Sequence, residues 1–137
     1  MKIISFGECE KIVRHPLIIV EEKRAKLIFR NSNRSRVRHI RIDDCVITVG
    51  PRCDYLLINQ QGIEHYVELK GSDVRRAFQQ IEETIKQVGV NTQQRKAFII
   101  STSCPMHGTE IQQKQKDFKK KYHTKLILMH TNDETDI

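Results

Sequence analysis

The stretch His65-Tyr66-Val67-Glu68-Leu69-Lys70-Gly71 decides how this chain folds. It predicts a β-strand, in which successive side chains point to opposite faces. Val67 and Leu69 would then face a core, while Glu68 and Lys70 share the other face. An acidic group and a basic group are therefore expected side by side where this strand ends.

A second apolar run precedes this strand and carries another acid. The run is Asp54-Tyr55-Leu56-Leu57-Ile58, and the segment after it, Asn59-Gln60-Gln61-Gly62, has the composition of a turn. The two runs are expected to pair as a hairpin. This pairing would bring Asp54 close to Glu68 and Lys70.

The residues after the strand change to a helical period. Ser72 or Asp73 can cap a helix at its N-terminus, and Gly89 is a natural stop at its C-terminus. The apolar residues between these caps recur at helical spacing, and they are Val74, Phe78, Ile81, Ile85 and Val88.

The order of the remaining elements predicts the fold class. Further strands are expected over 17–20, 25–30, 36–42, 96–101 and 125–129, with a second helix beginning at Thr109. Residues 1–15 allow a strand or a short helix. Early hairpins imply antiparallel pairing, and later strands that alternate with helices imply parallel pairing. We expect an α/β fold in which helices flank a mixed β-sheet, with a strand-rich N-terminal third.

Asp54, Glu68 and Lys70 together suit phosphodiester hydrolysis. A divalent ion neutralises phosphate charge and lowers the pKa of a coordinated water. Mg²⁺ prefers oxygen ligands and keeps several waters, so one or two carboxylates suffice. Asp54 and Glu68 can supply them, and the backbone carbonyl of Leu69 can add a neutral oxygen. Lys70 can orient or deprotonate the attacking water, and Mg²⁺ or Mn²⁺ is the expected ion.

Asp54, the apolar strand, Glu68-Leu69-Lys70 and the helix after them resemble the PD-(D/E)xK nuclease superfamily, which has the restriction-endonuclease-like fold. The resemblance covers about residues 45–101. It implies that Asp54 and Glu68 are metal ligands and that Lys70 is the catalytic lysine. It also implies a glutamine on the following helix. Gln79 and Gln80 stand there, and Gln80 is preferred because it lies nearer the buried side.

Two features of the superfamily are less easily placed. Some members, including archaeal Holliday-junction resolvases, add a glutamate from an N-terminal helix. Glu8 or Glu10 could match this glutamate, and Glu21 or Glu22 are weaker candidates. The sequence leaves the choice open. Arg52-Cys53 precedes Asp54, so the proline of the motif is missing from its usual place. The strand-rich N-terminal third also departs from members that open with a helix.

The charge of the chain favours a polyanionic partner. The net charge is +7, from 24 basic and 17 acidic residues. The candidates for nucleic-acid contacts are arginines at strand spacing and lysines of the second helix, namely Arg34, Arg36, Arg38, Lys116, Lys119 and Lys120. Solvated charged faces are the alternative for both groups. We expect the protein to contact the phosphates and the shape of duplex or branched DNA, and we favour DNA over RNA as the partner.

Length and cysteine content set further expectations. The 137 residues fit one domain over 1–137, with the tail from about 131 expected to fray. The cysteines, Cys9, Cys45, Cys53 and Cys104, form no CxxC pair, so reduced thiols in a cytoplasmic protein are expected. No apolar run is long enough to span a bilayer, and no secretory signal is found. No histidine pair has metal-binding spacing.

We therefore expect an enzyme, a Mg²⁺- or Mn²⁺-dependent nuclease, with DNA endonuclease as the first hypothesis. The alternative is a non-catalytic module with a nuclease-like fold that binds nucleic acid or joins a complex. RNA cleavage, or a basic interaction protein in which the VELKG sequence is incidental, are further hypotheses. One active site per chain would require a homodimer to cut both strands at once.

Overall fold

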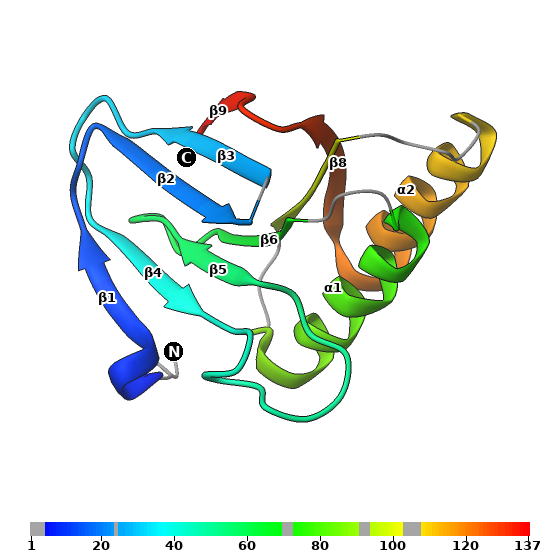
Figure 1. The fold of residues 1–137 in the computed structure, drawn as a ribbon, viewed down its shortest axis with the longest axis horizontal. Helices are drawn as coiled ribbons and strands as arrows, with labels where there is room; N and C mark the ends of the chain where they lie inside the picture. The colour runs from blue at the N-terminus through cyan, green and yellow to red at the C-terminus, as the bar shows by residue number, and fades with distance from the viewer. Residues whose placement is uncertain (1–4, 24, 70–72, 91–93, 103–107) are drawn as a thin grey trace.

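The computed structural model describes residues 5–23, 25–69, 73–90, 94–102 and 108–137, which build two sheets and two helices (Figure 1). The main sheet has the strand order β1-β4-β5-β6-β7-β8. Its strands are β1 (Glu10–Val13), β4 (Val37–Arg41), β5 (Tyr55–Ile58), β6 (Glu64–Leu69), β7 (Arg95–Ser101) and β8 (Thr124–His130). Pairing is antiparallel from β1 to β6 and parallel from β6 to β8. The expected α/β fold with a mixed sheet is confirmed.

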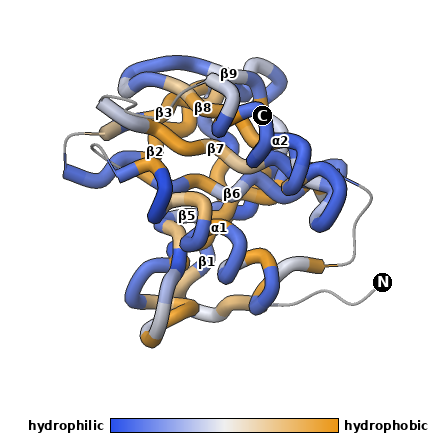
Figure 2. Tube along the Cα trace, turned by 90° about the vertical axis from the view of Figure 1, so that its right-hand side faces the viewer, coloured by the Kyte–Doolittle hydropathy of each residue, from blue (hydrophilic) through white to orange (hydrophobic). Residues whose placement is uncertain are grey.

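Two further layers pack on opposite faces of the main sheet. The helices α1 (Val74–Val88) and α2 (Gly108–Tyr122) connect its parallel strands and cover one face. A small sheet in the order β2-β3-β9 covers the other face. Its strands are β2 (Leu17–Glu22), β3 (Ala25–Arg30) and β9 (Glu134–Asp136). Figure 2 shows hydrophobic residues along the central strands and hydrophilic residues on α2.

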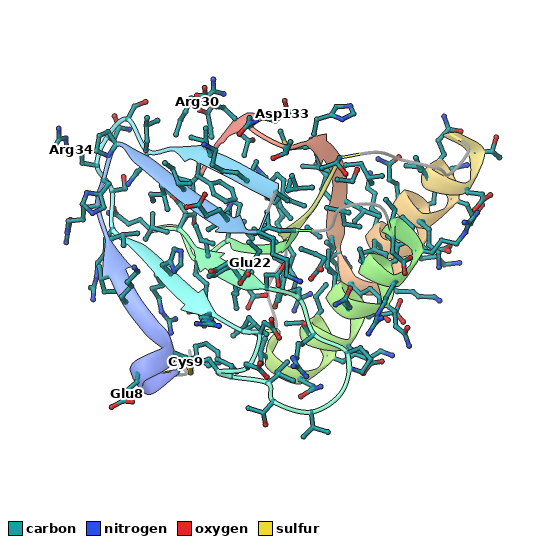
Figure 3. The ribbon with its side chains drawn as sticks, in the orientation of Figure 1. Glu8, Cys9, Glu22, Arg30, Arg34 and Asp133 are labelled. Atoms are coloured by element: carbon teal, nitrogen blue, oxygen red, sulfur yellow. A yellow bond between two sulfur atoms is a disulfide. The ribbon has the colours of Figure 1, made fainter. Side chains whose placement is uncertain are left out.

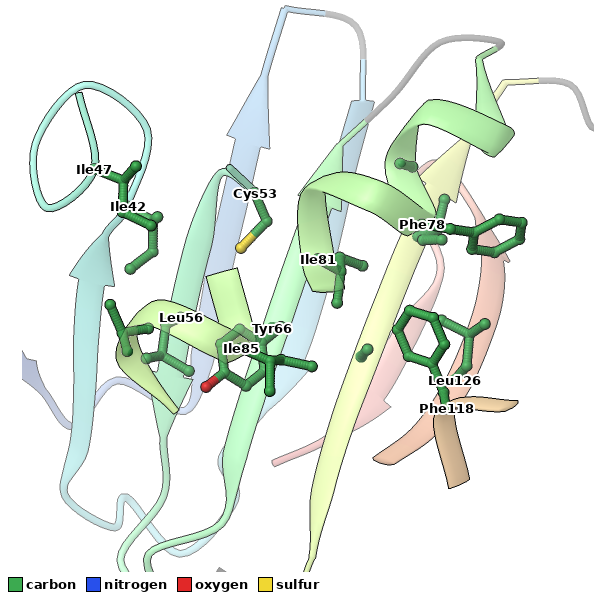
Figure 4. Close-up of a cluster of buried hydrophobic side chains, with 14 of the residues drawn as sticks. Ile42, Ile47, Cys53, Leu56, Tyr66, Phe78, Ile81, Ile85, Phe118 and Leu126 are labelled. Atoms are coloured by element: carbon green, nitrogen blue, oxygen red, sulfur yellow. The ribbon is translucent and has the colours of Figure 1, made fainter. Parts of the chain in front are cut away.

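The predicted hairpin of β5 and β6 forms, with Tyr55 opposite Val67. Along β6, Tyr66 joins the core beneath the helices (Figure 4), whereas Val67 and Leu69 join the core beneath the small sheet. Every residue of β6 is buried, because both faces of this strand are covered. Glu68, predicted on the face opposite Val67 and Leu69, is therefore only 1% exposed and lies on the helix side of the sheet.

The first helix has the ends that the sequence predicts. The Asp73 side chain accepts a hydrogen bond from the backbone N–H of Arg76 at 3.1 Å, and the Gly89 N–H donates to the carbonyl of Ile85 at 2.8 Å. The other candidate cap, Ser72, lies outside the described residues. Among the described residues, no helix has the length and apolar character needed to cross a membrane.

The cysteines differ from the expectation of reduced thiols. Cys9 and Cys45 form a disulfide, with a Cα–Cα separation of 5.7 Å. It ties the short 3-10 turn Gly7–Cys9, just before β1, to the turn that follows β4. Cys53 is a free, buried thiol, as expected. Cys104 lies outside the described residues.

The C-terminal end of the chain departs from expectation. The acidic tail was expected to fray, but residues 134–136 form β9, which pairs in parallel with β3. The Asp136 carboxylate lies 2.9 Å from the Arg30 guanidinium, so charge pairing supports this polar strand. Near the N-terminus, where the sequence allowed a strand or a short helix, the chain forms the 3-10 turn and then the strand β1.

A buried histidine joins the core beneath the small sheet. The ring of His65 stacks on Phe98 at 6.1 Å and meets the edge of Phe29 at 5.9 Å. Its Nδ1 lies 3.0 Å from the carbonyl oxygen of Ile63, so the proton sits on this nitrogen. Burial, together with the positive charge of Lys96, lowers the pKa of His65 to about 4.

This burial predicts a pH dependence of stability. An unfolded histidine titrates near 6.5, so the unfolded chain binds the extra proton first as the pH falls. The free energy of unfolding should decrease by about 3 kcal/mol between pH 7 and pH 4 from this group alone. Urea unfolding of the wild type and of His65→Phe isolates the effect, because the variant lacks the titrating ring. Equal losses in both proteins would contradict the assignment.

Candidate metal and phosphate site

A cavity of about 730 Å³ opens at the carboxyl end of β6. Its walls come from the β2–β3 hairpin, the segment between β4 and β5, and α1. Four acidic side chains line it, Glu22, Asp43, Asp54 and Glu68, as do the basic residues Lys23, Arg52 and Arg76. Acids and bases from distant parts of the sequence thus share one hollow.

Asp54 is held at the junction of β5 and β6. Its backbone N–H donates to the carbonyl of Val67 at 3.1 Å, which extends the hairpin by one residue. Its side-chain Oδ2 accepts the N–H of Leu69 at 2.8 Å. The hairpin therefore brings Asp54 against the end of β6, where the sequence predicts it to lie beside Glu68.

The surroundings of Glu68 are buried and acidic. Burial raises the pKa of the neighbouring Cys53 thiol, and the negative charges of Glu68 and Asp54 raise it further. The thiol consequently stays protonated at neutral pH. The donors that this part of the cavity offers to a cation are carboxylate oxygens, the ligand type that hard divalent cations prefer.

Three of the four acids that line the cavity form a cluster. One carboxylate oxygen each from Glu22, Asp43 and Asp54 lies within 4.8 Å of the other two. The three residues come from the end of β2, from the turn after β4 and from the residue before β5 (Figure 3 labels Glu22). Like charges at this spacing repel one another, so a bound cation would stabilise the arrangement.

The cavity also indicates which N-terminal glutamate is placed to join the site. Glu22 lines it, whereas Glu21 alternates to the exposed face of β2. Glu10 pairs instead with Arg38 at 2.6 Å across β1 and β4, and this hydrogen bond lowers the pKa of Glu10. Glu8 is exposed in the 3-10 turn. The weaker sequence candidate is thus the one that reaches the cavity.

Gln80 lines the cavity from α1, and its neighbour Gln79 is exposed. The Gln80 side-chain N–H donates to the carbonyl of Arg52 at 3.1 Å. One turn further along α1, the Thr84 hydroxyl accepts the N–H of Cys53 at 2.8 Å. The helix therefore holds the backbone that leads into Asp54.

Arg52 links the acidic cluster to the loop beside it. Its Nε donates to Asp43 at 2.7 Å, its Nη2 to Asp44 at 2.9 Å and its Nη1 to the carbonyl of Gly50 at 3.1 Å. This fork orients the Asp43 carboxylate and offsets part of its charge. Sequence reasoning missed Lys23, Asp43 and Arg52 because they stand well before the VELKG stretch along the chain. It missed Arg76, on the helix just after that stretch, because no motif or spacing singled this residue out.

The other predicted residues lie elsewhere. Lys70 is outside the described residues, although Leu69 before it lines the cavity. Arg36 and Arg38 line a separate depression beside β1, and Arg38 is engaged with Glu10. Arg34 precedes β4 in a turn, with a φ of 50°, so the three arginines do not share one strand. Lys116, Lys119 and Lys120 are exposed on α2.

Comparisons of the chain with protein-family models, with curated proteins and with solved structures found no match.

The position of Glu22 leads to a matched pair of variants. We expect Glu22→Gln to weaken Mn²⁺ binding about tenfold, because it removes a charged oxygen ligand from the acidic cluster. Glu21→Gln removes the same charge from the adjacent, outward-facing position and should leave the affinity nearly unchanged. Isothermal titration with MnCl₂ compares the two dissociation constants. Equal affinities would exclude Glu22 from the metal site.

Proposed function

We propose that this chain is a metal-dependent nuclease that hydrolyses phosphodiester bonds, with DNA as its favoured substrate. One observation carries the proposal: the acids of the β5–β6 hairpin and Gln80 of α1 line a single cavity that also contains basic side chains. This is the arrangement that the resemblance to the PD-(D/E)xK superfamily implies.

The donor set of the cavity fits a hard divalent cation. Asp54 and Glu68 would hold Mg²⁺ or Mn²⁺, with the backbone carbonyl of Leu69 as a neutral ligand and Glu22 as a further carboxylate. The bound ion would polarise the phosphoryl oxygen and supply a water of lowered pKa. The hydrogen bond from the Leu69 N–H keeps Asp54 in place for this role.

The remaining residues of the cavity have distinct tasks in this proposal. Lys70 would orient or deprotonate the attacking water, as the resemblance implies. The Gln80 Oε1 atom is buried and has no hydrogen-bond partner among the described residues, so it can accept a hydrogen bond from a water. Arg76 and Lys23 stand at the cavity wall where phosphate oxygens would lie.

The net charge of +7 supports a polyanionic substrate. A binding module without catalysis could use the same charge. It would not need a paired Asp54 and Glu68 beside a lysine, however, and these residues distinguish the two hypotheses.

The test is cleavage of plasmid, single-stranded and branched DNA, and of RNA, with Mg²⁺ or Mn²⁺. We expect Asp54→Asn and Lys70→Met to lower the rate by about 1,000-fold, because each removes a charge that acts directly on the reacting phosphate or water. Gln79→Ala, on the exposed side of α1, serves as the matched control for Gln80→Ala and should retain the wild-type rate.

Two outcomes would overturn the proposal. Cleavage at wild-type rate by both charge variants would identify a contaminating nuclease. DNA binding without turnover by the wild type, unchanged in Lys70→Met, would identify a non-catalytic module.

A further inference from the structure

The loop beside the acidic cavity has an apolar tip. Gly50, Pro51 and Arg52 line the cavity, and Val49 comes directly before them. Val49 is 82% exposed, which makes it the most exposed large apolar side chain among the described residues. The next, Leu17, is 53% exposed and begins β2, roughly 17 Å along the strand from Glu22. Val49 is thus the strongly exposed apolar group that adjoins the cavity.

The first half of this loop is fixed to the protein. Ile42 and Ile47 are buried in the core beneath the helices (Figure 4). The Ile47 N–H donates to the carbonyl of Ile42 at 3.0 Å, and the Asp44 backbone N–H donates to the carbonyl of Ile47 at 3.1 Å. The disulfide of Cys45 with Cys9 ties the same turn to the start of β1.

The second half of the loop is equally braced. The Arg52 guanidinium binds the carbonyl of Gly50 and the carboxylates of Asp43 and Asp44. The backbone of the next residue, Cys53, is hydrogen-bonded to Thr84 of α1. Gly50 has a φ of +84°, a value that glycine adopts without strain, and this allows the sharp turn just after Val49. The loop therefore holds Val49 outward on a supported frame.

We propose that Val49 is a wedge that enters the base stack of duplex DNA beside the phosphodiester bound in the cavity. This inference rests on the proposed nuclease function and specifies its substrate class, a duplex at a step that unstacks readily. Proteins that kink duplexes insert apolar side chains between bases in this way. A braced side chain loses little freedom on binding, so more of the gain from its burial is retained.

The shape of the cavity explains why a duplex would need to be opened. Its acids line a hollow in which Glu68 is only 1% exposed, and a straight duplex is stiff over a few base pairs. Opening one step lets the backbone bend toward Asp54 and Glu68, while the nearby cations Lys23 and Arg76 contact the flanking phosphates. Flexible steps such as TA and CA should then be cut in preference to stiff A-tracts.

The test uses duplexes that carry 2-aminopurine, whose fluorescence rises when it is unstacked, on either side of the mapped cleavage site. The protein carries Asp54→Asn, which blocks turnover while DNA is bound. We expect saturating protein to raise the fluorescence several-fold at one position. Adding Val49→Ala or the isosteric Val49→Thr should reduce this rise by at least half, whereas Val49→Leu should keep it. Leu17→Ala, at the other exposed apolar site, should change nothing.

The inference is overturned if the Asp54→Asn protein binds the duplex without a fluorescence rise, or if Val49→Ala leaves the rise intact. Metal-dependent cleavage of the same duplex, measured in parallel on protein with the native Asp54, reports the proposed nuclease function. Cleavage without unstacking would therefore contradict the wedge proposal and leave the proposed nuclease function standing. Absence of both DNA binding and cleavage would contradict the wedge proposal and the proposed nuclease function together.

Discussion

The hydrogen bond from the Leu69 N–H to the Asp54 carboxylate is the contact on which the site depends. Asp54 stands one residue before β5, and Leu69 is the last residue of β6, so this bond closes the open end of the hairpin. Both strands lie in the middle of the main sheet with layers on both faces. The acids at their ends are thus positioned by the most buried part of the fold.

Around that contact, the protein gathers carboxylates from several segments of the chain. Three carboxylates from separate segments approach within 4.8 Å, and the Arg52 fork engages one of them. The α1 residues Gln80 and Thr84 hold the intervening backbone from the other side. In the proposed function, the carboxylate oxygens would hold a cation, and the positive side chains of the cavity would contact a phosphate bound to it.

Local patterns in the sequence were sufficient to predict the hairpin, the first helix and the mixed sheet. Asp54 could be placed beside Glu68 because a short turn fixes the pairing of neighbouring strands. Gln80 could be preferred over Gln79 because helical periodicity separates the buried side of α1 from the exposed side. These predictions rest on residues close together in the chain.

The features that the sequence did not reveal depend on contacts between distant segments. Asp43 and Arg52 reach the cavity because the segment between β4 and β5 lies beside α1, where the backbone of Arg52 and Cys53 is hydrogen-bonded to Gln80 and Thr84. Glu22 could have been ranked higher from the alternation of β2, since Ile18 and Val20 face inward on the same side. The polar β9 and the pairing of Cys9 with Cys45 had no local signal, because strand addition and disulfide connectivity are set by tertiary structure.

The most direct measurement is anomalous diffraction from crystals soaked in MnCl₂. The account predicts a manganese peak in the cavity at the end of β6, with carboxylate oxygens of Asp54 and Glu68 at about 2 Å from the ion. Manganese bound only elsewhere on the surface, with both carboxylates ordered and turned away from each other, would contradict it.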